Sequence, residues 1–439
     1  MKMVRSISLL FGPSAGRCAS TIFNSNSSSN TFSTDLLRRL MSSSTITDRQ
    51  QPLEFSRLKI KRARLSDLKE KPPVSDLVFG KVFTDHMLTI DWDTEQGWNA
   101  PQIGPFQNFS MHPGAKVLHY AQELFEGMKA YRGVDGKIRM FRPMHNMARM
   151  NVTAARCCLP TFDGAELLRC IRELVLLDSA WVPHDTSSSL YIRPTLIGTE
   201  PTIGLGPANE TRLFVLLSPV GPYYSAGFNP VNLLCDPAYV RAWPGGCGYA
   251  KMGSNYAPTL WIQKVAAEKG CQQVLWLLGE DQQITEVGAM NLFILLRDPS
   301  GQLELVTPCL SSGCILPGVT RRSVVELVSG WPDVRVTERT ICMDEVMAAL
   351  SEGRLVEMFG SGTAAVVSPV GGLHYQGSLH TIPTPEDGLA TRIMAAMTDI
   401  YYGRTASPWS VEVETWDLEQ TQALEDYFQP EAVRTTAAV

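Results

Sequence analysis

A lysine preceded by glycines is the centre of the stretch from which most chemistry can be expected. Lys251 follows three glycines within the segment 241–256, and small or apolar residues flank it. An ammonium group in such surroundings is poorly solvated, so the amine can act as a nucleophile. The phenols of Tyr249 and Tyr256 offer hydroxyls beside it. A glycine-rich surface loop with a solvated lysine explains this segment equally well, so other stretches must decide.

Seven further motifs, in a fixed order along the chain, favour the chemical interpretation. With the lysine segment they resemble the branched-chain amino acid aminotransferases, which belong to the fold-type-IV class of pyridoxal-phosphate enzymes. The resemblance runs from about residue 77 to about residue 413 and implies reversible amino transfer between L-leucine, L-isoleucine or L-valine and 2-oxoglutarate. The seven motifs are the segments 79–87, 124–131, 146–150, 191–194, 285–291, 316–319 and 360–364.

The resemblance assigns a contact to each part of pyridoxal 5'-phosphate. Lys251 would form the aldimine and carry the substrate proton, Tyr256 would hydrogen-bond the phenolic oxygen, and Glu286 would keep the ring nitrogen protonated. Helix N-termini supply the backbone donors that bind phosphate, and residues 316–320 open a predicted helix. The implied cofactor-binding residues are Arg149, Lys251, Tyr256, Glu286, Val319, Thr320 and Thr363.

The substrate site must accept both a branched apolar side chain and the second carboxylate of glutamate. By the resemblance, aromatic residues form its apolar walls, and a tyrosine and an arginine form its polar side. The implied substrate-binding residues are Phe79, Phe125, Tyr191, Arg193, Tyr223 and Ala364, together with Tyr120 and Leu205 from a neighbouring subunit. The expected active unit is therefore a homodimer whose other partners are the small-molecule amino and 2-oxo acids.

Two positions depart from the family pattern. Ala289 stands where many relatives have a threonine near the cofactor, so a hydroxyl contact there is in doubt. Ala365 and Ser368 stand where mammalian members carry a C-x-x-C redox pair. Neither side chain can form a disulfide, so we expect that switch to be absent.

Hydrophobic periodicity predicts the elements that position these motifs. Strands are predicted at residues 78–83, 87–92, 191–197, 212–217, 231–235, 274–278, 291–296, 303–306, 334–342 and 355–359. Helices are predicted at residues 145–158, 163–180, 257–269, 318–329, 344–351 and 389–402. The fold class is α/β, with mixed α+β character, in the two-domain fold-type-IV architecture: residues 51–220 form the smaller N-terminal domain, 221–230 a linker, 231–413 the larger C-terminal domain and 414–439 a tail.

Composition excludes several other classes of function. A net charge of −5 and a pI near 5.9 argue against a nucleic-acid surface, which needs clustered lysine and arginine. The ten cysteines form no C-x-x-C pair, so we expect free thiols and no metal site. No apolar run reaches the roughly 18 residues that a membrane helix needs, so no membrane partner is expected.

The N-terminal residues 1–50 have the composition of a transit peptide. Residues 1–34 contain Lys2, Arg5 and Arg17, no acidic residue, and many serines and threonines. We therefore predict import into the mitochondrial matrix followed by removal of this segment. Plastid transit peptides have a similar composition, and a disordered tail would also be rich in serine and asparagine.

Two other functions are compatible with parts of the pattern. One is another fold-type-IV activity, such as a D-amino acid aminotransferase or an aminodeoxychorismate lyase; the long N-terminal domain and the Tyr191-x-Arg193 pair argue against it. The other is a non-catalytic scaffold that binds pyridoxal phosphate. The joint presence of Lys251, Tyr256, Glu286 and Arg149 argues against such a loss of catalysis.

Overall fold

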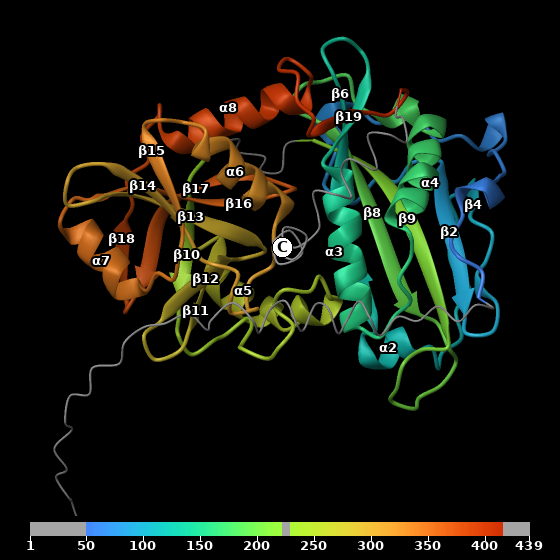
Figure 1. The fold of residues 1–439 in the computed structure, drawn as a ribbon, viewed down its shortest axis with the longest axis horizontal. Helices are drawn as coiled ribbons and strands as arrows, with labels where there is room; N and C mark the ends of the chain where they lie inside the picture. Colours follow the sequence, from blue (N-terminus) through green and yellow to red (C-terminus); the bar gives the residue numbers. More distant parts are fainter. Residues whose placement is uncertain (1–49, 222–228, 416–439) are drawn as a thin grey trace, which may run out of the picture.

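The computed structural model describes residues 50–221 and 229–415. Two large sheets occupy the two halves of the molecule, the first built from the N-terminal half of the chain and the second from the C-terminal half (Figure 1). Helices and strands are both abundant, so the predicted mixed α/β class is confirmed.

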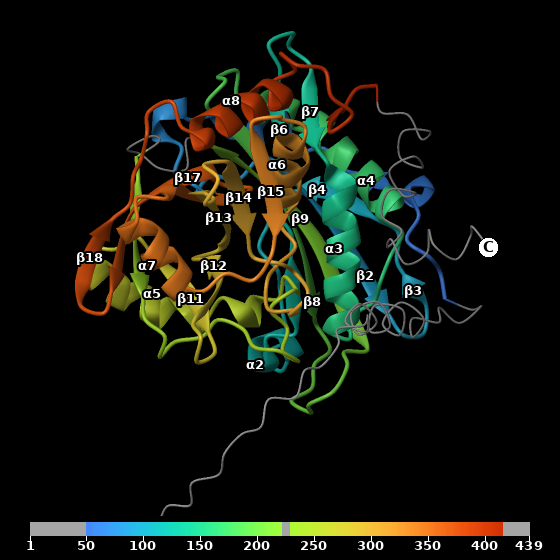
Figure 2. The ribbon, with the colours of Figure 1, turned by 60° about the vertical axis from the view of Figure 1, so that its left-hand side comes forward.

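The first sheet is almost entirely antiparallel. Its strands are β1 (Lys59–Ile60), β2 (His86–Asp93), β3 (Gly97–Trp98), β4 (Gln102–Pro105), β5 (Glu123–Phe125), β6 (Met128–Arg132), β7 (Ile138–Phe141), β8 (Ser189–Gly198), β9 (Glu210–Val220) and β19 (Ser410–Glu412), and its helices are α2 (Lys116–Tyr120), α3 (Pro143–Arg156) and α4 (Gly164–Leu177). The order is β1-β4-β2-β9-β8-β6-β7-β19, with β3 on β2 and β5 on β8. Helices α3 and α4 lie side by side against it (Figures 1 and 2).

Alternation along β9 explains the core of this half. Leu213, Val215 and Leu217 point to one face and are almost fully buried. Helix α4 presents leucines and isoleucine at three- and four-residue steps to the same core. It begins where the sequence predicts, because the Asp163 carboxylate accepts hydrogen bonds from two first-turn N–H groups.

The second sheet is mixed. Its strands are β10 (Val231–Cys235), β11 (Gln273–Leu278), β12 (Gln283–Val287), β13 (Met290–Arg297), β14 (Leu303–Thr307), β15 (Val334–Glu338), β16 (Leu355–Gly362), β17 (Val366–Tyr375) and β18 (Ser378–Thr381), and its helices are α5 (Thr259–Glu268), α6 (Val319–Ser329), α7 (Met343–Ser351) and α8 (Leu389–Tyr401). The order is β12-β11-β10-β17-β16-β13-β14-β15, with β18 on β17. Strand β10 is parallel to both of its neighbours.

An aromatic core joins the two halves. Tyr131 of β6 stacks on Tyr401 of α8 with ring centroids 4.7 Å apart, and Phe141 of β7 meets Tyr401 edge-on. The same cluster contains Val366 and Val367 of the second sheet. After α8 the chain returns to the first half, where β19 pairs with β7. The two halves therefore meet in a packed seam.

One predicted strand is wrong and one is too long. Residues 78–83 form a turn, in which Gly80 has φ +69° and Lys81 N–H donates to the Val78 carbonyl. A residue with positive φ interrupts a strand, and glycine adopts that conformation without a steric penalty. Strand β15 ends at Glu338, so the prediction to residue 342 is too long. The other predicted strands and helices are confirmed within a few residues at each end.

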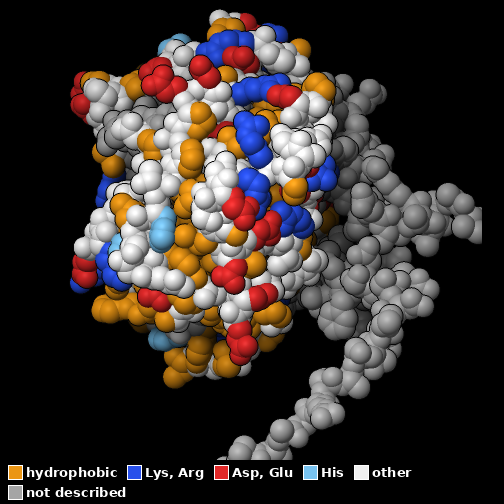
Figure 3. All heavy atoms as spheres, turned by 90° about the vertical axis from the view of Figure 1, so that its left-hand side faces the viewer, with side chains coloured by type: hydrophobic (Ala, Val, Ile, Leu, Met, Phe, Trp, Pro, Cys, Tyr) orange, Lys and Arg blue, Asp and Glu red, His pale blue; other side chains and the backbone are white. Residues whose placement is uncertain are grey.

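The surface of the second half carries both signs of charge. Figure 3 shows Lys and Arg lying among Asp and Glu on this face. In the same half of the chain, Arg392 and Asp333 form an ion pair at 2.7 Å. In residues 50–221 and 229–415, no helix has the length and apolar character to cross a bilayer. The same ranges hold no group of three or more His, Cys, Asp or Glu suited to a metal ion.

Candidate active site

The first half of the molecule holds the backbone of Lys251, although this residue belongs to the second half of the chain. Its N–H donates to Thr153 Oγ1 of α3 at 3.0 Å, and its carbonyl accepts from the N–H of Phe125 on β5 at 3.2 Å. Met252 forms an isolated bridge with Leu124 of the same strand. The lysine therefore lies where the two halves meet.

The Lys251 amine lies between two aromatic rings. Its Nζ is 3.1 Å from the Tyr256 hydroxyl and 4.6 Å from the centroid of the Phe125 ring. The Phe125 and Tyr256 rings are themselves 5.0 Å apart. The pairing of Lys251 with Tyr256 that the sequence predicts is therefore present. Tyr249, the other predicted phenol, is not among the contacts of this amine, and burial raises its pKa.

Three polar residues form a row across the second sheet. Glu286 of β12 pairs with Asn291 of β13, which in turn pairs with Ser361 of β16. Directly opposed residues on adjacent strands point to the same face, so these side chains lie next to one another. Asn291 Nδ2 donates to the Leu316 carbonyl at 2.9 Å, and this contact brings the row to the start of α6.

Glu286 is a buried carboxylate held by two donors. Its Oε1 accepts from Leu316 N–H at 2.6 Å, and its Oε2 lies 3.2 Å from Arg241 Nε. Burial raises the pKa of Glu286, while Arg241 opposes that shift. Arg241 and the Leu316 N–H stabilise the ionised carboxylate, and the ionised carboxylate is the form that pairs with a protonated ring nitrogen.

Arg149 and Glu126 form a second buried ion pair. Arg149 Nε and Nη2 donate to the two carboxylate oxygens at 2.7 and 2.8 Å, a bidentate arrangement. Burial would raise the pKa of Glu126, but the charge and hydrogen bonds of Arg149 hold it below its ordinary value. Arg149 Nη1 also donates to the Pro317 carbonyl at 3.1 Å, so the guanidinium lies beside the start of α6.

The start of α6 has the features of an anion-binding site. Gly318 precedes the helix without a side-chain cap, and the first-turn N–H groups of Val319 and Thr320 donate to no acceptor in the described ranges. The buried Ser361 hydroxyl also has no hydrogen-bond partner in this part of the chain. Such groups suit phosphate, so the residues present fit pyridoxal phosphate: a nucleophilic lysine, a phenol, a buried carboxylate and an uncapped helix start.

The residues predicted for substrate binding form a continuous group beside Lys251. Arg193 Nη2 donates to the Tyr191 hydroxyl at 3.1 Å, and its guanidinium lies 4.8 Å from the Phe125 ring. Phe79 meets Tyr191 edge-on with centroids 4.9 Å apart. The structure thus brings these four side chains together near the lysine.

The remaining predicted residues lie in several places. Thr363 and Ala364 are half-buried in the turn between β16 and β17. Tyr120 and Leu205 are 41% and 84% exposed and have no contact with Lys251 among the described residues of this chain. Tyr223 lies outside the described residues.

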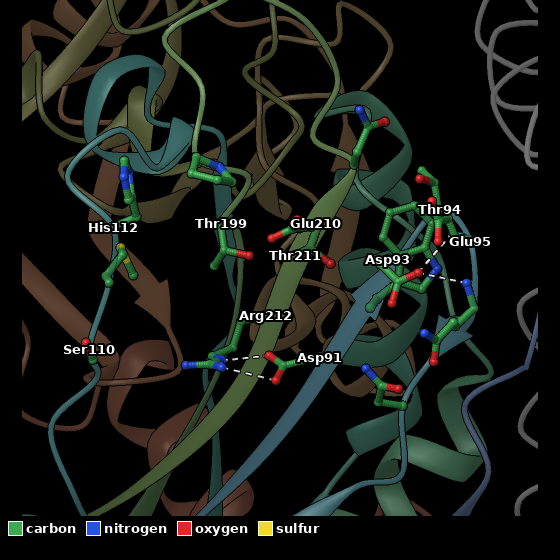
Figure 4. Close-up of a pocket in the computed structure, with 16 residues that line it drawn as sticks. Asp91, Asp93, Thr94, Glu95, Ser110, His112, Thr199, Glu210, Thr211 and Arg212 are labelled. Atoms are coloured by element: carbon green, nitrogen blue, oxygen red, sulfur yellow. Dashed lines mark hydrogen bonds and ion pairs between the residues drawn. The ribbon is translucent and has the colours of Figure 1, made fainter.

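A hollow of about 680 Å³ lies away from this group, on the first half of the molecule (Figure 4). Asp91 and Arg212, which both line it, form a bidentate ion pair at 2.7 and 3.0 Å. Residues of β2, β9 and the loops beside them line the hollow, and Lys251 is not among them. This hollow therefore adds nothing to the chemistry predicted around the lysine.

Comparison with known proteins decides the family. Residues 123–372 match the amino-transferase class IV family. A cytosolic branched-chain-amino-acid aminotransferase from Ovis aries is 56% identical over 353 residues, which are 80% of this chain and 91% of that protein. The chain belongs to the branched-chain aminotransferases of class IV.

A more distant relative and a solved structure complete the comparison of this branched-chain aminotransferase. The mitochondrial branched-chain-amino-acid aminotransferase of Bos taurus is 50% identical over 348 residues, covering 79% of this chain and 88% of that protein. The crystal structure of the Thermobaculum terrenum branched-chain amino acid aminotransferase in its PLP form has a TM-score of 0.58 at 19% identity, covering 74% of this chain and 98% of that one. At that identity the likeness supports the fold alone.

Sequence reasoning did not identify several residues that build the site. Glu126 and Arg241 form ion pairs with the predicted Arg149 and Glu286. Asn291 pairs in register with Glu286, and Ser361 pairs in turn with Asn291. Glu126 lies inside the motif 124–131 and Asn291 ends the motif 285–291. Those positions were the only signal available, because the partners of these residues lie far away in the sequence.

Proposed function

We infer that this protein is a branched-chain-amino-acid aminotransferase that uses pyridoxal 5'-phosphate. It reversibly transfers the amino group between L-leucine, L-isoleucine or L-valine and 2-oxoglutarate. The observation that carries this conclusion is the Lys251 amine, 3.1 Å from the Tyr256 hydroxyl, in a site whose buried carboxylate, Glu286, lies beside an uncapped helix start. The branched-chain-amino-acid aminotransferases to which the chain is similar support the same reaction.

The bound cofactor supplies an electron sink for the negative charge that develops at the substrate Cα. The residues of the chain do the rest. Lys251 is the amine that holds the cofactor and, once released, carries the proton to and from the substrate Cα. Tyr256 orients that amine through its hydroxyl. Glu286 would face the ring nitrogen, and the negative charge of its carboxylate would keep that nitrogen protonated, because a nearby opposite charge favours the charged form.

Phosphate and substrate carboxylate are the two anions for which the site is suited. The carboxylates of Glu126 and Glu286 are each matched by an arginine, Arg149 and Arg241. Val319, Thr320 and Thr363 are proposed to hold the phosphate, next to Arg149, and Ala364 to contact the substrate. Because an arginine neutralises each buried carboxylate, neither leaves an uncompensated negative charge that would repel these anions.

Two kinds of substrate side chain can share one site. Phe79 and Phe125 offer apolar surface to a branched side chain, while Arg193 and the Tyr191 hydroxyl offer donors to the second carboxylate of glutamate. No carboxylate in the described part of the chain forms an ion pair with Arg193, although Tyr191 and Phe125 hold its guanidinium in place. Tyr223 is proposed to complete the apolar wall.

The active unit is proposed to be a homodimer. Leu118, Tyr120, Ile203 and Leu205 are apolar or aromatic and 61%, 41%, 71% and 84% exposed. The Tyr120 hydroxyl donates to the Ile203 carbonyl, so these residues form one preassembled projection. Burial of this projection against a second copy would remove apolar surface from water, and Tyr120 and Leu205 would then line the partner's site.

Mitochondrial location and the domain limits are also proposals. The composition of residues 1–34 supports import, and both cytosolic and mitochondrial relatives match the chain. Strand β19 lies within the proposed C-terminal domain, residues 231–413, but pairs with β7 of the first sheet. We keep the proposed linker at residues 221–230, because β9 ends at Val220 and β10 begins at Val231. A reporter fused to residues 1–50 tests the location by reaching mitochondria or failing to do so.

A coupled assay tests the reaction itself. With L-leucine and 2-oxoglutarate the holoenzyme should form glutamate, and Lys251→Ala should form none. D-Alanine in place of L-leucine is the matched control, because a D-amino acid aminotransferase would accept it. Activity with D-alanine alone would contradict the proposed substrate class.

A further inference from the structure

Lys129 is a buried amine outside the machinery described so far. It lies on β6, is 8% exposed, and its Nζ donates to the Ala364 carbonyl at 2.9 Å across 235 residues of sequence. Burial lowers its pKa to about 8, and no carboxylate in the described part of the chain forms an ion pair with it. A buried amine without a counter-ion destabilises a fold, so its presence calls for a function.

The turn that accepts this hydrogen bond makes few backbone hydrogen bonds of its own. Residues 363–365 connect β16 to β17, and their N–H groups donate to no backbone acceptor in the described chain. Val366, which follows, has φ +62°. A β-branched residue is strained at positive φ. Within the turn the Ala365 carbonyl accepts from Val367 N–H at 2.8 Å, and Ala365 is buried. Ala364 is half-buried, and the hydrogen bond from Lys129 is the contact that holds its carbonyl.

The strand that carries Lys129 is paired with a strand on each side and adjoins the substrate side of the site. In the register of the first sheet Lys129 pairs with Tyr191, whose hydroxyl meets Arg193. Two residues further along the same face of β6, Tyr131 stacks on Tyr401 in the aromatic seam. The amine is therefore held at a fixed point between the polar side of the site and the joint of the two halves.

We propose that Lys129 is a positioning residue for the substrate: by holding the Ala364 carbonyl across the seam, its ammonium group fixes the turn 363–365 against the site. This rests on the proposed function, in which Ala364 contacts the substrate. Loss of the ammonium group lets the turn relax, and the protein then binds substrate carboxylates more weakly. The chemical step itself needs no atom of Lys129.

The test compares holoenzyme variants at position 129. Lys129→Met removes the donor, Lys129→Gln keeps a neutral donor, and Lys129→Arg keeps a charged one. Lys69→Met is the matched control, because Lys69 Nζ also donates only to backbone carbonyls, those of Phe83 and Thr84, away from the site. The probe is 4-methylpentanoate, which is leucine without its amino group and so binds without reacting.

Four quantities separate positioning from general stability. They are the dissociation constant of 4-methylpentanoate (measured from cofactor absorbance), the KM for L-leucine, the kcat for L-leucine, and the rate of hydrogen exchange of the segment 360–368. For Lys129→Met we expect the dissociation constant and KM to rise about tenfold, as for loss of one hydrogen bond to a charged group, with kcat changed less than threefold. Exchange of the segment should accelerate, Lys129→Arg should restore most of the binding, and Lys69→Met should match the wild type.

Other outcomes would overturn the proposal. Unchanged binding of 4-methylpentanoate by folded Lys129→Met would do so, and so would a fall in kcat alone. If Lys129→Met does not fold, Lys129→Gln must show weakened binding; failure of all three variants to fold would assign Lys129 a structural role only. A wild-type protein that binds no 4-methylpentanoate would instead contradict the proposed function, so the two failures can be told apart.

Discussion

Replacing Glu286 with glutamine disturbs a buried ion pair by a single atom. The two carboxylate oxygens face two donors, Leu316 N–H at 2.6 Å and Arg241 Nε at 3.2 Å. Glutamine has one oxygen only, so its NH2 group must turn toward one of those donors. The shorter contact to Leu316 should retain the oxygen, which leaves Arg241 facing an amide nitrogen.

The cost follows from the surroundings of Arg241. Its side chain is 3% exposed, so water cannot replace the lost carboxylate. Breaking a buried ion pair by removing one partner costs about 3–5 kcal/mol. Arg241 keeps the carbonyls of Cys314 at 3.1 Å and Gly248 at 3.4 Å as acceptors, so we expect the lower end, about 3 kcal/mol of unfolding free energy.

Denaturation and kinetics measure the two consequences separately. Urea unfolding of wild type, Glu286→Gln, Arg241→Met and the double variant forms a double-mutant cycle, in which the coupling energy should be about 2–3 kcal/mol. The holoenzyme of Glu286→Gln should keep its cofactor but lose about a hundredfold or more in kcat with L-leucine, since an amide holds the ring-nitrogen proton less firmly.

Two results would refute this reasoning. Additive losses in the cycle would mean that Arg241 and Glu286 do not interact. Wild-type turnover in Glu286→Gln would remove Glu286 from the mechanism, whatever its effect on stability.

Three further predictions concern neighbouring features. In Gly127→Ala the new Cβ would lie 2.0 Å from the Tyr191 hydroxyl, so this hydroxyl must move. We expect kcat/KM for 2-oxoglutarate to fall about tenfold further than kcat/KM for 4-methyl-2-oxopentanoate. Equal losses for the two substrates would contradict this prediction. Burial first, then Arg142, lowers the pKa of His145 to about 2 from 6.5, so the stability it contributes is present above pH 6.5 and is lost as the pH falls. At pH 5 the wild type should have lost about 2 kcal/mol of unfolding free energy relative to His145→Gln. Urea midpoints that change equally for the two proteins from pH 7 to pH 5 would contradict this prediction. Mild peroxide should leave activity intact, because Ala365 and Ser368 cannot form a disulfide and burial raises the pKa of the Cys157 thiol to about 12; inactivation reversed by dithiothreitol would contradict it.

Local relationships in the site could be predicted from sequence. Lys251 and Tyr256 are five residues apart in one loop, and their contact at 3.1 Å follows from a motif that spans both. The start of α4 was also predictable, because Asp163 both precedes the apolar periodicity and caps the helix. By contrast, β5 and β6 have three and five residues, too few to show a period of their own.

Contacts between distant segments could not be predicted. Glu126 and Arg149 come from a strand end and a helix, Arg241 and Glu286 from different sides of the lysine loop, and Lys129 meets Ala364 across 235 residues. The row from Glu286 to Ser361 depends on strand register, which alternation within one strand does not determine.

Reductive trapping tests the central claim most directly. Sodium borohydride makes the bond between the cofactor and its lysine permanent, and peptide mapping by mass spectrometry then locates the added pyridoxyl group. We predict that the modified peptide contains Lys251 as the only modified lysine, and that prior addition of L-leucine, which displaces this amine, prevents the labelling. A pyridoxyl group on Lys129 or on any other lysine, or labelling that L-leucine does not reduce, would contradict the account.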